Sequence, residues 1–84
     1  MRYSATVTVT LKPGVLDPQG AAVGKALTAL GFEGVGEVAV GRHVVLELEA
    51  ENLGQAEAKA REMARRLLAN PVLEVFRVAV REAV

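Results

Sequence analysis

A catalytic function requires a nucleophile, a base or a set of metal ligands that the fold can bring together, and this sequence offers few candidates. His43 is the only histidine. Glu47 and Glu49 share its face of a predicted strand and are the only nearby groups that could join it in binding a metal. The absence of cysteine excludes disulfides, thiolate metal sites and cysteine nucleophiles. A surface histidine after a turn is the simpler interpretation, and we expect no catalytic, cofactor-binding or metal-binding residue in this chain.

Two further charged groups have a functional and a simpler interpretation. Glu47, Glu49 and Glu51 could bind a divalent cation or a basic partner, but a charged strand face that discourages edge aggregation is the favoured interpretation. Arg65 and Arg66 could hold a phosphate. Arginines near the end of a helix more often interact with its dipole and with glutamates one turn earlier, so neither group is assigned a ligand.

The most informative segment is a strand-to-helix junction near the start of the chain. Lys12, Pro13 and Gly14 could offer a cation and backbone amides to an anion, although the order of a P-loop is absent. Turn formation is the simpler interpretation, because Pro13 ends strand pairing and Gly14 permits a positive φ. Asp17 can then cap a helix that has Pro18 at its first position.

Hydrophobic periodicity predicts six elements in the order βαββαβ. They are strands at residues 3–12, 35–40, 43–50 and 76–81, a helix at 18–30, and a helix that begins after Asn52 and ends before Pro71. Gly41 and Arg42 are expected to form a tight hairpin turn between the two central strands. We therefore expect an α+β, ferredoxin-like fold in which two helices cover one face of an antiparallel sheet, as a single domain over residues 1–84.

Composition narrows the possible partners. The ten basic and ten acidic residues balance, which argues against a nucleic-acid or membrane-surface protein. No apolar run is long enough to cross a membrane, and we expect a cytoplasmic protein. Hydrophobic residues make up 51% of a short chain, more than one small core can bury. Part of the apolar surface should therefore face a partner.

The chain resembles PurS, the small subunit of phosphoribosylformylglycinamidine synthase. The resemblance covers essentially the full length and rests on residues 11–20, the pairs Ala22-Val23 and Ala26-Leu27, the run Leu30-Gly31-Phe32, and residues 67–72. It implies a non-catalytic subunit of purine biosynthesis that joins a PurL-like, ATP-dependent synthetase subunit to a PurQ-like glutaminase subunit and supports ammonia transfer. It also implies a homodimer or higher homo-oligomer, with ATP and magnesium bound by the synthetase subunit and no cofactor in this chain.

Loops on a rigid scaffold often carry recognition, and we expect the partner contacts at the two junctions. The residues are Lys12, Pro13, Gly14, Asp17 and Pro18 in the first junction, and Asn70 and Pro71 in the second. The outer face of the sheet is a further candidate.

Three other functions stay open as alternatives. A ferredoxin-like regulatory module would bind a small molecule at a dimer interface. A nucleic-acid binder would need exposed aromatic residues on the strands, whereas Phe76 is predicted to point inward. An acylphosphatase-like enzyme would need a phosphate-binding loop that the sequence does not show.

Overall fold

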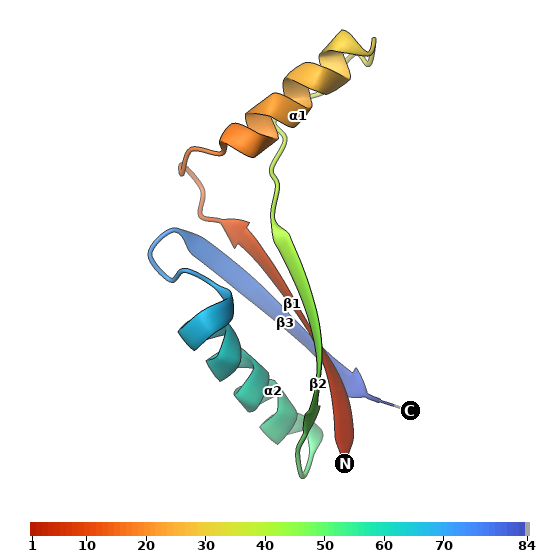
Figure 1. The fold of residues 1–84 in the computed structure, drawn as a ribbon, viewed down its shortest axis with the longest axis vertical. Helices are drawn as coiled ribbons and strands as arrows, with labels where there is room; N and C mark the ends of the chain where they lie inside the picture. Colours follow the sequence, from red (N-terminus) through yellow and green to blue (C-terminus); the bar gives the residue numbers. More distant parts are fainter. Residues whose placement is uncertain (84) are drawn as a thin grey trace.

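The computed structural model describes residues 1–83, so the last residue of the expected 1–84 domain lies outside the described part. Its elements are β1 (Arg2–Leu11), α1 (Pro18–Ala29), β2 (Arg42–Glu49), α2 (Leu53–Met63), the π-helical turn η1 (Ala64–Leu68) and β3 (Glu74–Glu82). The strands form an antiparallel sheet in the order β2-β1-β3. Figure 1 shows α2 lying along this sheet, whereas α1 projects well beyond it.

The alternation of apolar and polar residues in β1, the central strand, determines which face of the sheet is buried. The apolar residues of β1 (Tyr3, Ala5, Val7 and Val9) are all buried on the side of α2. Val7 lies between Val44 of β2 and Val78 of β3 in the two registers, so apolar residues align across all three strands. The hydroxyl residues of β1 alternate with these apolar residues and therefore occupy the opposite face.

Small side chains let α2 approach the sheet closely. Ala56, Ala60 and Ala64 follow one another at helical spacing and are fully buried against β1 and β3. The Asn52 side chain accepts a hydrogen bond from the Gln55 amide at 2.8 Å and caps α2, which begins directly after Asn52 as predicted. The helix and its π-turn end before Pro71, also as predicted.

The central part of the chain differs from the expected hairpin. Residues 35–40 are extended, but they are not paired as a strand, and Gly41 and Arg42 do not form a turn. The physical reason is that this segment is held along α1: the Val40 amide donates to the Asp17 carboxylate at 2.9 Å. The segment still occupies the second strand position in the βαββαβ order, so the α+β class and the ferredoxin-like order are confirmed.

The first helix also lies in an unexpected place. Among residues 1–83, α1 packs closely against no strand, and only α2 covers the sheet. We call residues 12–41 the arm, because the chain leaves the sheet after Leu11 and rejoins it at Arg42 (Figure 1). The chain consequently measures 50 × 29 × 15 Å with a radius of gyration of 16.3 Å, whereas a compact chain of this length has about 12 Å.

No helix in residues 1–83 is long and apolar enough to cross a membrane.

The alanine row of α2 gives a direct test of this packing. Replacing Ala60 by leucine should destabilise the protein by about 1–3 kcal/mol, because the added side chain has no room between the helix and the sheet. Replacing Ala58, which is exposed on the same helix, by leucine is the matched control and should have little effect. Urea unfolding followed by circular dichroism measures both, and equal stabilities would contradict the packing described.

Candidate subunit interface

The base of the arm is organised by one carboxylate. Asp17 Oδ1 accepts from the Gly20 amide at 2.8 Å and caps α1, as predicted. Its Oδ2 accepts from the Val40 amide at 2.9 Å and ties the returning segment to the helix. These backbone donors, Gly20 first, lower the pKa of Asp17 below its ordinary value. The negative charge therefore holds the two sides of the arm together.

Glycine at position 20 is required by this contact. A Cβ atom built on Gly20 would lie only 2.0 Å from the Val38 carbonyl oxygen. At Gly24, one turn later, a Cβ atom would lie 3.5 Å from a methyl group of Val38, which is ordinary contact. The helix can thus approach the returning segment most closely at its first turn.

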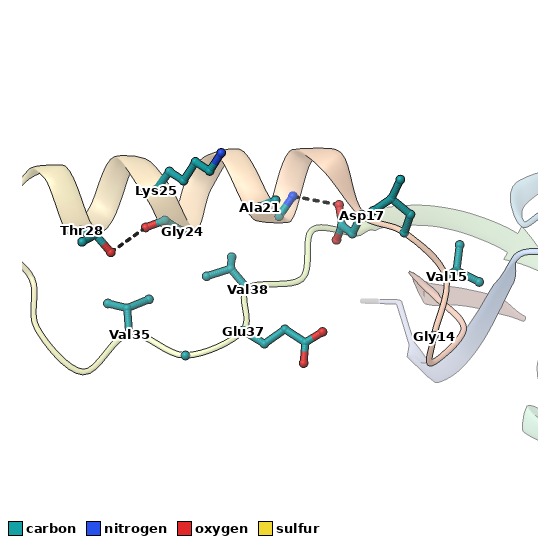
Figure 2. A pocket seen from close by; sticks show the side chains of 13 residues that line it. Gly14, Val15, Asp17, Ala21, Gly24, Lys25, Thr28, Val35, Glu37 and Val38 are labelled. Atoms are coloured by element: carbon teal, nitrogen blue, oxygen red, sulfur yellow. Dashed lines mark hydrogen bonds between the residues drawn. The ribbon is translucent and has the colours of Figure 1, made fainter.

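A hollow of about 620 Å³ lies between α1 and the returning segment. Figure 2 shows Val35 and Val38 pointing from the segment toward the helix, while Lys25 and Glu37 extend away from the space between them. The Thr28 hydroxyl donates to the Gly24 carbonyl at 3.1 Å, so it is already satisfied. This lining contains no converging acid, base and nucleophile, and it suits an apolar contact better than a chemical reaction.

The arm exposes most of its large apolar side chains. Leu16 is 82% exposed and Leu30 is 75% exposed, and Val23, Phe32 and Val35 are also exposed. Gly31 has a φ of 96° and ends the helix as predicted. Val23 and Leu30 lie at helical spacing on α1, but nothing in the single chain covers them, because α1 does not lie on the sheet.

The two predicted junctions come together at one end of the sheet. The Lys12 amide donates to the Leu73 carbonyl at 2.9 Å, and the Leu73 amide donates to the Asn70 carbonyl at 3.2 Å. Pro13, Gly14 and Pro71, which follow Lys12 and Asn70 in the chain, are exposed. We call residues 11–15 and 67–74 together with Arg42 the junction edge. Asp17 and Pro18 lie instead at the base of the arm, where Asp17 is half-buried.

Arg42 and Glu74 are residues of this edge that were not predicted as site residues. Arg42 donates through Nη1 and Nη2 to the two carboxylate oxygens of Glu74 at 2.9 and 2.8 Å, and through Nη2 to the Leu68 carbonyl at 2.8 Å. Glu74 also accepts from the Asn70 amide at 2.8 Å. Arg42 and then Asn70 lower the pKa of Glu74. This network joins the start of β2 to the end of η1. Its only signal in the sequence is an arginine and a glutamate 32 residues apart.

The junction edge is also apolar on its outer side. Leu67 is 83% exposed, Val72 is 74% exposed, and Leu73 is partly exposed next to them. Apolar side chains gathered beside a fixed polar network are typical of a protein-protein contact.

The remaining charged candidates lie apart from one another. His43 is exposed and its ring Nδ1 lies 3.5 Å from the Thr8 hydroxyl. Arg65 and Arg66 both pair with Glu62, the latter at 2.7 Å as predicted. Glu49 pairs with Arg2 and the N-terminal amine. Across residues 1–83, the structure brings together no group of three or more histidines or carboxylates that could hold a metal.

The family model, the related sequences and the similar structures all indicate the same family. The family model PurS, described as phosphoribosylformylglycinamidine (FGAM) synthase, matches residues 4–82. The PurS subunit of Methanocaldococcus jannaschii is 40% identical over 78 residues, covering 93% of this chain and 94% of that protein. The PurS subunit of Bacillus subtilis is 39% identical over 82 residues, covering 98% and 96%.

Solved structures agree with the sequence matches. The structure of PurS from Thermus thermophilus is 48% identical, with a TM-score of 0.89 and full coverage of both chains. A chain in the structure of PurLQS from Thermotoga maritima is 27% identical, with a TM-score of 0.88 over 96% of this chain and 99% of that one. These scores cover nearly the whole chain, so the projecting arm lies within the similarity.

The role of Asp17 can be tested by pH. Its lowered pKa means that it stabilises the folded chain above the ordinary carboxylate range, and that this contribution is lost as the pH falls through about 4 toward the folded pKa. Asp17→Asn keeps an oxygen for the helix cap but presents an amide donor to the Val40 amide. At pH 7 it should lower Tm by about 4–8 °C.

The difference between the two proteins should shrink below about pH 4, where Asp17 becomes protonated. Glu49 and Glu74 also have lowered pKa values, and they act equally in both proteins. Thermal melts between neutral and acid pH measure the difference. A Tm gap that stays constant with pH would contradict a stabilising carboxylate at position 17.

Proposed function

This chain belongs to the PurS family of phosphoribosylformylglycinamidine synthase, and we propose that it works in that enzyme as a non-catalytic docking subunit. It joins a PurL-like synthetase subunit to a PurQ-like glutaminase subunit and supports ammonia transfer between them. ATP and magnesium act in the synthetase subunit, and the complex works in the cytoplasm. The chain itself is part of a homodimer or a higher homo-oligomer.

The observation that carries this proposal is the excess of exposed surface. The accessible surface is 6073 Å², whereas a compact protein of 8.9 kDa exposes about 4,800 Å². The excess of about 1,300 Å² exceeds the roughly 800 Å² that one partner contributes to a standard interface. The chain therefore exposes enough surface to form an interface with a partner. Its described residues offer no converging reactive groups.

The junction edge supports the contact with the larger subunits. Its backbone is fixed by the Lys12–Leu73 hydrogen bond and the Arg42–Glu74 pair. Its outer residues, Leu67 and Val72, are among the most exposed apolar side chains of the chain. A rigid edge that carries exposed apolar groups needs little ordering when it binds, which favours affinity.

The regulatory-module alternative has less support. The hollow beside α1 is large enough for a small molecule, at about 620 Å³. However, its lining provides few polar groups that converge on one point, and a specific ligand needs several.

The proposed role can be tested by reconstitution. The synthetase and glutaminase subunits, supplied with MgATP, glutamine and formylglycinamide ribonucleotide, should show higher glutamine-dependent activity when this chain is added. Activity with free ammonia should change much less, because ammonia bypasses the glutaminase. No gain in glutamine-dependent activity would remove the proposal.

Variants at the junction edge test where the contact lies. Val72→Glu should weaken assembly at least about tenfold, because it places an unpaired carboxylate in an apolar contact. Ala58→Glu, on the exposed side of α2, is the matched control. Titration of each variant into the two larger subunits, followed by glutamine-dependent activity, measures the effect. Equal half-saturation concentrations would exclude the junction edge as the contact.

A further inference from the structure

We propose that the outer edge of β3 accepts an extended segment of a partner protein as an added strand, and that this segment alternates apolar with acidic residues. The proposal goes beyond the proposed function, because it names a second docking site and the chemistry of the segment that binds there. It rests on the unpaired backbone of β3, on a hollow beside the start of this strand, and on two arginines of its outer face.

The hydrogen-bond pattern of β3 shows which of its backbone groups face outward. β3 is an edge strand, since the sheet order is β2-β1-β3. At one end of its pairing with β1 the Lys12 amide donates to the Leu73 carbonyl at 2.9 Å, and at the other end the Ala83 amide donates to the Arg2 carbonyl at 3.0 Å. Because alternate residues of an antiparallel strand direct their backbone groups to opposite sides, the odd-numbered residues of β3 face β1. The even-numbered residues face the open edge.

This open edge runs over the middle of β3. The Glu74 amide already donates to the Asn70 carbonyl at 2.7 Å, so the open run begins after it. Among residues 1–83, no backbone group outside the sheet pairs with the outward amides and carbonyls of Phe76, Val78 and Val80. The register between β1 and β3 is regular along its whole length. A long edge without a bulge or a proline is a template on which another strand can pair.

A hollow of about 370 Å³ adjoins the start of this edge. Ala69, Pro71, Val75 and Phe76 supply its apolar lining. Val75 is exposed and Phe76 is half-buried, so part of this lining is open to a partner. Side chains of a strand alternate between its two faces, and an apolar side chain on the inner face of an added strand would lie against Phe76. The hollow therefore provides an anchor position for the partner.

Arg77 and Arg81 indicate the charge of the partner. Both are exposed, and neither forms an ion pair among residues 1–83, whereas the arginines of α2 and η1 all pair with glutamates. Since their own backbone groups face β1, these two arginines occupy the positions where side chains of an added antiparallel strand come closest. Carboxylates four residues apart in that strand would face both of them. Ala79, between the two arginines, leaves the space between the carboxylates unobstructed.

The same face disfavours a second copy of β3 as the added strand. The outer residues of β3 are Val75, Arg77, Ala79 and Arg81, so a second copy would bring further arginines and no carboxylate to this face. Like charges placed opposite each other across strands are destabilising. The arginines thus select an acidic segment and discourage pairing between identical edges.

A designed peptide tests this edge directly. The probe is the acetylated and amidated heptapeptide Glu-Val-Thr-Val-Glu-Val-Thr, which in antiparallel pairing places its glutamates opposite Arg81 and Arg77. Titration into the intact chain should give saturable changes in the amide NMR signals of Phe76, Val78 and Val80 and should slow their hydrogen exchange. The counterpart with lysine in place of both glutamates should bind at least about tenfold more weakly, because it opposes like charges.

Charge reversal in the protein should reverse this preference. The variant with Arg77→Glu and Arg81→Glu should bind the lysine peptide better than the glutamate peptide. Arg66→Glu is the matched control, because Arg66 lies on η1 and pairs with Glu62, and it should bind both peptides like the wild type. Thermal melts followed by circular dichroism check that each variant is folded. Methylation of the three valine nitrogens of the peptide removes its donors to β3 and should abolish binding without any change in the protein.

Several results would overturn the proposal. If the amides of Phe76, Val78 and Val80 are already protected from exchange in the chain alone, a second copy occupies the edge. Equal binding of the glutamate and lysine peptides, signal changes away from β3, or no saturable binding at low millimolar peptide would each exclude the site as well. These measurements need neither of the larger subunits, so this proposal and the proposed function can fail separately.

Discussion

The Asp17 carboxylate holds the arm together at its base, where it joins the first turn of α1 to the segment that returns to β2. Because Asp17 accepts from the Gly20 amide and from the Val40 amide, the start of α1 and the end of the returning segment are fixed to each other. The close approach at Gly20 makes the same contact steric as well as electrostatic. The helix and the extended segment are consequently fixed to each other, and together they stand away from the sheet (Figure 1).

Most local structure could be predicted from the sequence because local residues determine it. The alternation in β1, the caps at Asp17 and Asn52, and the stop before Pro71 all act within a few residues. The family resemblance came from the same junctions. The Arg42–Glu74 pair was missed because its partners are far apart in sequence, and charge patterns of that separation carry little information.

The predicted hairpin at residues 41–42 failed for a different reason. The hydrophobic pattern of residues 35–40 is that of a strand, and a pattern states which face is to be buried, not which chain buries it. Likewise the stripe of Val23 and Leu30 is a correct sign of an apolar helix face, although nothing in the same chain covers it. The two predicted junctions did meet, through the Lys12–Leu73 hydrogen bond. They meet because β1 and β3 are antiparallel, so the end of β1 lies beside the start of β3.

The composition of the core has a further consequence. Its largest fully buried side chains are Val7 and Val9, and the layer between α2 and the sheet is built largely of alanine. Small side chains contribute little transfer free energy, so a solitary copy is only weakly stable. Association stabilises the native state by mass action. The temperature at which this polypeptide melts is therefore not fixed by its sequence alone, and it should rise as the sample is made more concentrated.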